Sequence, residues 1–173
     1  MYKVNDVVIY GTSGVCKILD ICQKSFAGTV SNYYILKPLL QNGTTVFIPT
    51  DNSRLTSKMH LTLTQDKFNC IFRSVCNKTP LRPESEQERQ SKFAEILESG
   101  NREALMLMIY DLHNYQTEQR ENGRRLHLAD ERLLNSAESL LFDEVAYVFN
   151  IDRSDAAEFV KKQFEDEKTV PVA

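Results

Sequence analysis

The chain has 173 residues, of which 42% are apolar and 26% charged, a composition typical of one or two globular domains. Its longest apolar run, Leu105 to Tyr110, is far too short to span a bilayer, which argues against a membrane-spanning helix. The N-terminal sequence MYKVND lacks a basic and then apolar signal segment, so we expect a cytoplasmic protein rather than an exported one.

Charge divides the chain into two parts. Residues 1–61 carry six basic and three acidic side chains, a net charge of +3. The remainder carries fifteen basic and twenty-one acidic side chains, a net charge of −6, and this contrast favours two modules. We therefore predict a first domain over residues 1–61 and a second over 62–168, with a polar linker at 77–83 and a tail at 169–173.

Short runs of β-branched and aromatic residues dominate the first domain and predict strands without intervening helices. A turn is expected over Gln23 to Gly28, and Asn42-Gly43 favours a tight hairpin because both residues tolerate a positive φ. The predicted strands are Val7 to Tyr10, Val15 to Ile21, Tyr33 to Leu36, Thr44 to Ile48 and a weaker one within 58–63. Five short strands at this spacing indicate a small SH3- or Tudor-like β-barrel.

The first two strands are joined by Gly11-Thr12-Ser13-Gly14, which invites comparison with a phosphate-binding loop. Such a loop leads into a helix and aims its backbone N–H groups at the anion. Here a strand pattern follows, and the G-x-x-x-x-G-K-S/T spacing is absent. The two glycines instead permit a tight reversal of the chain, so we predict a turn.

Beyond Thr64 the apolar residues recur with a helical period. Gly100 suits the position after a helix, and Asp152 suits a helix N-cap. Helices are predicted over Gln65 to Cys76, Glu84 to Ser99, Glu103 to about Glu118, Asp130 to Phe149 and from Asp152 onward. The predicted fold class is therefore α+β, a β-barrel followed by a compact helical bundle.

Candidate catalytic and metal-binding residues are sparse. The cysteines Cys16, Cys22, Cys70 and Cys76 have neither redox nor zinc spacing, and the three histidines have no metal-ligand spacing. Asp111 and His113 lie two apart, so on a helix they face different ways. We expect no catalytic, cofactor or metal site and predict that the protein is not an enzyme.

Short segments at a particular order and spacing run through both parts of the chain. They are Val4 to Tyr10, Gly14-Val15, Ile18, Ile21, Gly28, Tyr33 to Lys37, Val46 to Pro49, Asp51-Asn52, Leu97 to Asn101, Asp111-Leu112 and Leu128 to Ala137. Together these segments resemble the CarD/CdnL transcription regulators, whose barrel is shared with the transcription-repair coupling factor. The similarity rests on the order and spacing of the segments, and it covers roughly residues 2 to 165.

The resemblance implies that the barrel binds the β subunit of RNA polymerase by adding its open sheet edge to a strand there. The edge strand would be Thr44 to Ile48, with Lys24 on a neighbouring turn facing an acidic partner. Phe47 replaces a basic residue often present on that strand, and it either packs against the polymerase or faces into the barrel. The predicted polymerase-binding residues are Lys24, Thr44, Thr45, Val46, Phe47, Ile48 and Pro49.

The resemblance also implies that the helical half lies on promoter DNA and stabilises the open complex. Actinobacterial members place a minor-groove tryptophan before the Ser-Gly pair, but this chain has no tryptophan, and Glu86 occupies the corresponding position. The basic residues left for DNA contact are Arg89, Lys92, Arg120, Arg124, Arg125 and Arg132.

Two functions follow from these residues. The first is a transcription regulator that bridges RNA polymerase and promoter DNA. The second is an adaptor that binds the polymerase or another protein without contacting DNA, its acidic helices recruiting a partner. Within a module of net charge −6, any DNA contact must be local, weak and salt-dependent.

Overall fold

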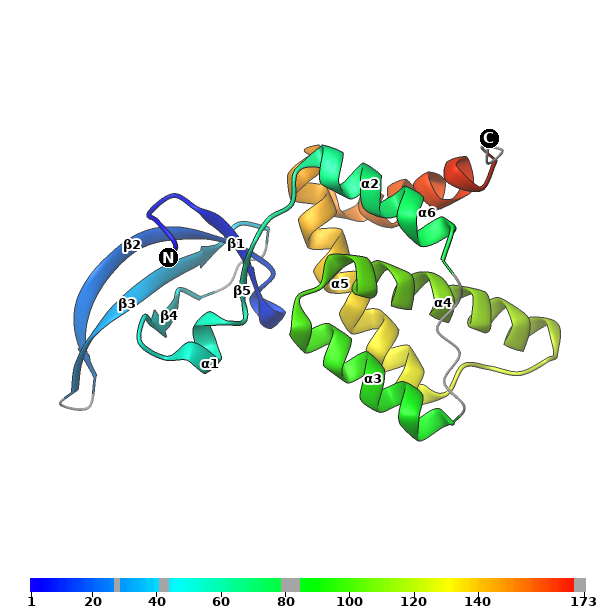
Figure 1. Cartoon of the computed structure of the whole chain (residues 1–173), viewed down its shortest axis with the longest axis horizontal. Helices are drawn as coiled ribbons and strands as arrows, with labels where there is room; N and C mark the ends of the chain where they lie inside the picture. The colour runs from blue at the N-terminus through cyan, green and yellow to red at the C-terminus, as the bar shows by residue number, and fades with distance from the viewer. Residues whose placement is uncertain (27–28, 41–43, 79–84, 170–173) are drawn as a thin grey trace. The chain divides into compact units, whose positions relative to one another are not determined.

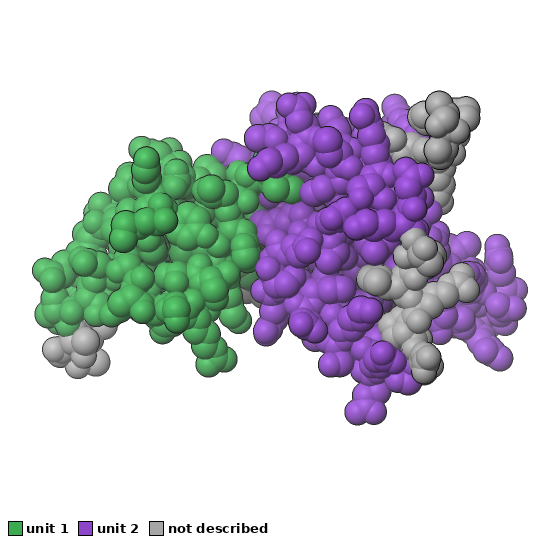
Figure 2. All heavy atoms as spheres, in the orientation of Figure 1, with its two compact units in different colours: residues 1–63 green, residues 64–173 purple. Residues whose placement is uncertain are grey.

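The computed structural model describes residues 1–26, 29–40, 44–78 and 85–169 (Figure 1). The chain divides into two compact units, Met1–Leu63 and Thr64–Ala173, which Figure 2 colours separately. The first unit is a β-sheet and the second a bundle of helices, which confirms the predicted α+β class. Among the described residues, no helix has the length and apolar content needed to cross a membrane.

The strands of the first unit form one antiparallel sheet in the order β4-β3-β2-β1-β5. The sheet is open, with β4 and β5 as its two edges, and it is compatible with the predicted Tudor-like barrel. In Figure 1, β2 and β3 form a long hairpin that curves along its length. The elements are β1 (Val7–Tyr10), the 3₁₀ turn η1 (Gly11–Ser13), β2 (Val15–Phe26), β3 (Thr29–Pro38), β4 (Val46–Pro49), α1 (Ser53–Thr56) and β5 (Met59–Leu61).

A β-bulge in β2 decides which face of the sheet its residues occupy. Strict alternation would place Asp20 on the same face as Ile18, which is completely buried. The pairing with β3 shifts between Ile18 and Asp20, so Ile21 instead lies opposite the core residue Tyr34. The extra residue, Leu19, keeps the Asp20 carboxylate out of the core. The buried cluster consists of Val8, Cys16, Ile18, Tyr34, Leu36, Ile48 and Met59.

The Gly-Thr-Ser-Gly segment is a turn, as predicted. It forms η1 between β1 and β2, and Gly14 has a φ of 64°, which glycine adopts without strain. The Gly14 N–H donates to the Gly11 carbonyl at 3.3 Å, and the Tyr10 N–H donates to the Gly14 carbonyl at 3.0 Å. Because a strand follows, these backbone groups close the reversal.

The predicted turn at Gln23 to Gly28 is wrong over its first residues, because β2 continues to Phe26. The polar residues Gln23 and Lys24 carry no strand signal of their own, but β3 pairs with them across the hairpin. The predicted strand from Thr44 begins only at Val46. The predicted Asn42-Gly43 hairpin lies outside the described residues, as do most of the linker at 77–83 and the tail beyond Thr169.

The short helix α1 was not predicted. Its N-cap is Asn52, whose side-chain oxygen accepts a hydrogen bond from the Leu55 N–H at 3.1 Å. Leu55 packs against the core cluster of the sheet, so this single turn links β4 to β5 while covering apolar surface. The segment is too short for a helical period to appear in the sequence.

The second unit contains five described helices, each near its predicted position. Side chains of Thr64, Ser85 and Asn101 cap the first turns of three helices, and Gly100 ends the second helix with a φ of 67°. These caps satisfy backbone N–H groups that a helix start leaves free. The helices are α2 (Gln65–Cys76), α3 (Glu86–Ser99), α4 (Arg102–Glu121), α5 (Leu128–Phe149) and α6 (Arg153–Thr169).

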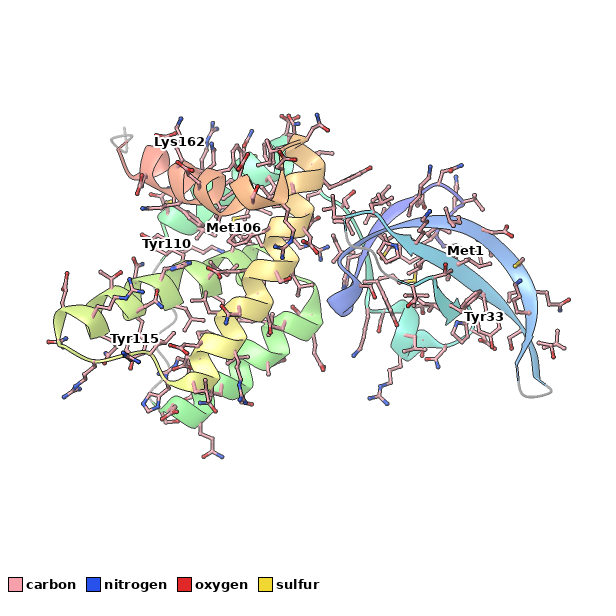
Figure 3. All side chains as sticks on the ribbon, turned by 180° about the vertical axis from the view of Figure 1, so that it is seen from behind. Met1, Tyr33, Met106, Tyr110, Tyr115 and Lys162 are labelled. Carbon is pink, nitrogen blue, oxygen red and sulfur yellow. The ribbon has the colours of Figure 1, made fainter. Side chains whose placement is uncertain are left out.

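The helix α4 runs through the core of this unit. Residues 105–109 are all buried, so α4 is covered on every side in its first half, beyond the single stripe that its period predicted. An aromatic cluster joins α2, α4, α5 and α6, with Phe72 and Phe164 ring centroids 5.3 Å apart. Figure 3 shows Met106, Tyr110 and Tyr115 projecting from α4.

Buried charges on α5 hold three neighbouring segments. Asp130, Asp143 and Glu144 are each at most 1% exposed, and each accepts hydrogen bonds from a basic side chain of another helix. Removing one member of such a pair leaves the other charge buried and unneutralised, which is strongly destabilising. The pairs are Arg89–Asp130 (2.6 Å), Arg102–Glu144 (2.8 Å) and Arg153–Asp143.

Candidate functional site

Among the described strands, β4 lies at one edge of the sheet and pairs with β3. Its residues Val46, Phe47, Ile48 and Pro49 lie opposite Leu36, Ile35, Tyr34 and Tyr33. An edge strand leaves one row of backbone N–H and C=O groups available to another chain. The identity of these groups follows from the pairing pattern.

In an antiparallel pair, residues alternate between those that exchange hydrogen bonds with the neighbouring strand and those that point away. The Thr50 N–H donates to the Asn32 carbonyl at 2.9 Å, so these two residues form a bonded pair. Counting back by two, Ile48 and Val46 also bond to β3. The N–H and C=O of Phe47, and the C=O of Pro49, therefore point toward the open edge. Pro49 has no N–H to bond, and it occupies one of the positions where β3 requires none.

The side chains of β4 alternate between core and surface. Ile48 is fully buried and Val46 packs against the core cluster, whereas Phe47 is 40% exposed. Phe47 therefore lies on the outer face, which we define as the face opposite the core, and the inward alternative is wrong. Paired residues share a face, so the outer face also carries Ile35, opposite Phe47, and Tyr33, opposite Pro49.

The other edge, β5, is partly closed by the start of the chain. The Thr62 N–H donates to the Val7 carbonyl at 3.2 Å, so by the same alternation Met59 points its backbone groups outward. The Tyr2 hydroxyl donates a hydrogen bond to the Met59 carbonyl. The Tyr2 ring also packs edge-on against Tyr34, with centroids 5.9 Å apart. The two edges thus differ, because one outward carbonyl of β5 is bonded to a side chain from the start of the chain.

The remaining predicted polymerase-binding residues lie around this edge at different distances. Thr44 and Thr45 precede β4 and are exposed, outside the strand itself. Lys24 lies within β2 opposite Ser31, rather than on a turn, and is separated from β4 by β3. Lys24 is exposed and lies on the outer face, so it flanks the edge instead of forming part of it.

In the helical unit, Arg89 is engaged inside the fold. Its Nη2 and Nε donate to the two carboxylate oxygens of Asp130 at 2.6 and 3.2 Å, and its guanidinium lies 5.0 Å from the Tyr115 ring centroid. The hydrogen bonds to Asp130 raise the pKa of Arg89 further above its ordinary value. Its side chain is only 15% exposed, so Arg89 joins α3 to α5 rather than facing solvent.

The other predicted DNA-binding residues are exposed, and the described residues offer none of them an ion-pair partner. Arg120 lies in the last turn of α4, and Arg132 lies near the start of α5. Between them, the Arg124 N–H donates to the Gln119 carbonyl at 2.8 Å, which folds the connection back against α4. These exposed cations are Lys92, Arg120, Arg124, Arg125 and Arg132.

On α3, acidic side chains reduce the positive electrostatic potential around Lys92. Lys92 shares its helix face with Glu88 and Glu95, four positions before it and three after it. Glu86 lies 3.6 Å from His127 Nδ1, at the start of α5. The first turn of α3 therefore meets the start of α5. The segment that carries Arg120, Arg124 and Arg125 also contains Glu118 and Glu121.

Asp111 and His113 face different ways on α4, as predicted. Asp111 is buried, whereas His113 is 49% exposed and contacts Glu138 on α5 at 2.8 Å. The four cysteines are free thiols. Within the described part of the chain, no group of three His, Cys, Asp or Glu side chains is arranged to hold a metal ion.

Comparison of the sequence with known protein families identifies the N-terminal unit. Residues 2–60 match the family model described as the CarD-like/TRCF RID domain. The N-terminal unit is a CarD-like RID domain. RID domains interact with the β subunit of RNA polymerase, which gives this chain a polymerase-binding role connected with transcription. The RID domain is a protein-interaction module rather than an enzyme fold, and the helical unit is consistent with a CarD-like protein.

Sequence reasoning missed two groups that shape the RID domain and the helical unit. The first is Tyr2, whose hydroxyl caps β5; a tyrosine so near the chain start carries no periodic signal. The second is the set of α5 carboxylates, of which Asp130 was named only as the start of a predicted helix. The sequence does contain a signal for these carboxylates, because Asp130, Asp143 and Glu144 lie beside or within the apolar stripe of α5.

Proposed function

We propose that the RID domain docks on the polymerase β subunit by pairing its β4 edge with a strand of that subunit. The observation that carries this proposal is the outward direction of the Phe47 N–H and C=O and the Pro49 C=O. Main-chain hydrogen bonds to this row supply affinity, and the side chains beside it supply selectivity. The exposed Phe47 ring adds apolar contact in place of an ionic one.

The unequal edges support β4 over β5 as the docking strand. Pairing at β5 requires the Tyr2 hydroxyl to leave the Met59 carbonyl and Tyr2 to give up its contact with Tyr34. Pairing at β4 leaves both of these Tyr2 contacts in place. The net charge of +3 over residues 1–61 also favours an acidic surface around the partner strand.

We further propose that the helical unit contacts promoter DNA through the arginines of the α4–α5 connection while the RID domain holds the polymerase. Arg120, Arg124, Arg125 and Arg132 are exposed, and none forms an ion pair with a described residue. Free arginines of this kind suit phosphate contacts, which strengthen binding without reading sequence. Arg89 is left out of this set because Asp130 occupies its guanidinium. In this function the protein modulates the stability of the promoter open complex.

The engagement of Arg89 by Asp130, together with the net −6 charge of residues 62–173, favours a second candidate, an adaptor that binds polymerase without touching DNA. Fluorescence-detected binding of the full chain to polymerase, alone and on a promoter fragment, separates the two. The bridging function predicts tighter binding to the polymerase–promoter complex, with an advantage that falls as salt rises. Equal affinity for polymerase with and without DNA at every salt concentration would support the adaptor.

A further inference from the structure

The outer face of the RID domain is hollowed at the C-terminal end of β4. Tyr33 lies on this face opposite Pro49, and Figure 3 shows Tyr33 on the sheet. Beyond Pro49 the chain turns through Asp51 into the cap of α1. The residues lining the hollow are Ser31, Tyr33, Pro49, Asp51, Asn52 and Ser53.

The hollow continues the docking edge. Phe47 and Pro49 share the outer face, and Asp51, in the turn that follows β4, lines the same hollow as Pro49. A strand that pairs with β4 places alternate side chains on this face, about 5 Å from their cross-strand neighbours. Its residue opposite Pro49 therefore projects over the hollow between Tyr33 and Asp51.

The chemistry of the hollow suits a cation. The Asp51 side chain is exposed and forms no hydrogen bond or ion pair with a described residue, whereas the neighbouring Asn52 side-chain oxygen is already used to cap Leu55. Tyr33 lines the same hollow, and an aromatic ring attracts a cation toward its π face. An arginine or lysine side chain satisfies both at once, by an ion pair with Asp51 and a cation–π contact with Tyr33.

The opposite end of the same face has the opposite charge. Lys17 and Lys37 lie directly across from each other on β2 and β3, and Lys37 follows Leu36, which pairs with the first residue of β4. Like charges placed in this way repel a cation. Lys24 is level with the hollow but lies on β2, roughly 10 Å from the β4 edge at two interstrand spacings. That distance is about one Debye length, so Lys24 weakens the Asp51 site only slightly.

We propose that this hollow binds the cationic side chain of an arginine or lysine on the polymerase β strand that pairs with β4. The proposal rests on β4 docking and deepens it. Main-chain pairing alone permits several registers, because each shift by two residues restores the same hydrogen bonds. A cation held at Asp51 and repelled at Lys17 and Lys37 selects one of them.

The test measures binding of the full-length chain to purified RNA polymerase at two salt concentrations. Asp51→Asn is expected to weaken binding about two- to five-fold at low salt, the range of an exposed ion pair, and to make binding less salt-sensitive. Asp51→Lys is expected to weaken it further, because attraction becomes repulsion. Tyr33→Leu removes the π face and is expected to weaken binding by a similar factor. The matched control is Asp20→Asn, an exposed acid of the same face on β2, which is expected to leave affinity unchanged.

Phe47→Pro, measured in parallel, separates this proposal from the docking proposal. If Phe47→Pro abolishes binding while Asp51→Asn and Asp51→Lys bind like the unchanged protein, the edge docks but the hollow holds no cation. Tighter binding by Asp51→Lys would show that the occupant is acidic and would also overturn the proposal. If Phe47→Pro binds normally, β4 docking itself fails. Because the Asp51 side chain forms no hydrogen bond or ion pair with a described residue, both Asp51 variants are expected to melt like the parent.

Discussion

Docking through β4 predicts that Phe47→Pro and Phe47→Ala differ sharply in polymerase affinity, although both remove the same ring. The Phe47 N–H points away from β3, so a proline there deletes no hydrogen bond to β3. Pro49, two residues on in the same alternation, shows that this row of β4 accommodates proline. Both variants are therefore expected to fold.

The ring contribution follows from its exposure. A phenylalanine side chain offers about 200 Å² of surface, of which the 40% still exposed amounts to roughly 80 Å². Covering that area in the complex contributes up to about 2 kcal/mol at ~25 cal/mol per Å². Phe47→Ala therefore weakens binding by at most about 30-fold.

Phe47→Pro loses the same ring and also the outward N–H. The partner carbonyl that this N–H would meet is then buried without a donor, which costs about 1 to 3 kcal/mol. Phe47→Pro is thus expected to bind about 5- to 150-fold more weakly than Phe47→Ala. Biolayer interferometry of the full chain on immobilised polymerase measures both constants, and circular dichroism checks that each variant is folded. Equal affinities for two folded variants would refute pairing through this N–H.

Three further predictions concern the helical unit. Changing Arg124 and Arg125 to Ala removes up to two phosphate contacts, so on polymerase–promoter complexes the slope of log affinity against log salt should become shallower by up to about 1.8; an unchanged slope would contradict DNA contact there. Asp130→Ala leaves the mostly buried Arg89 guanidinium without its carboxylate partner, so it should lower the free energy of unfolding by about 3 kcal/mol in urea titrations. A loss below about 1 kcal/mol would contradict a stabilising role for the Arg89–Asp130 ion pair. Hydrogen bonds from the Ser74 hydroxyl and the Lys78 ammonium lower the pKa of Glu103. The Glu103 carboxylate therefore stabilises the fold above its unfolded pKa, and that contribution disappears as pH falls through the folded pKa. Glu103→Gln should be less stable than the parent at pH 7, with a stability difference that closes below about pH 4, and a difference independent of pH would contradict this role.

The parts of the fold that the sequence predicted are those with a regular apolar period. The stripes of α2 and α5, with Phe68, Phe72, Leu134 and Leu141 fully or nearly buried, repeat often enough to define a helix face. The end of β2 was missed for the opposite reason. Gln23 and Lys24 extend the β2–β3 hairpin beyond the core, so their strand conformation comes from cross-strand hydrogen bonds rather than from burial.

Some features of the candidate site could likewise be predicted from the sequence, and others could not. That β4 is an edge follows from strand order, and its sequence position was predictable from the Thr44 to Pro49 run. Which residues of β4 face outward was not, because the pairing parity depends on where β3 aligns with it, as the Thr50–Asn32 bond shows. Likewise, the sequence shows Arg89 as a free cation in a basic group, but its partner Asp130 is 41 residues away and meets it only in the folded bundle.

The hydrogen bond from the Tyr2 hydroxyl to the Met59 carbonyl limits how this protein can self-associate at high concentration. A sheet with two receptive edges can accept a neighbour on each side and grow into an open ribbon, the geometry of fibre formation. Because the Met59 carbonyl of β5 is already bonded to the N-terminal segment, a neighbour adds to β4 more readily than to β5. Two copies joined through β4 would each use up that edge, so self-association favours a closed pair over an open ribbon.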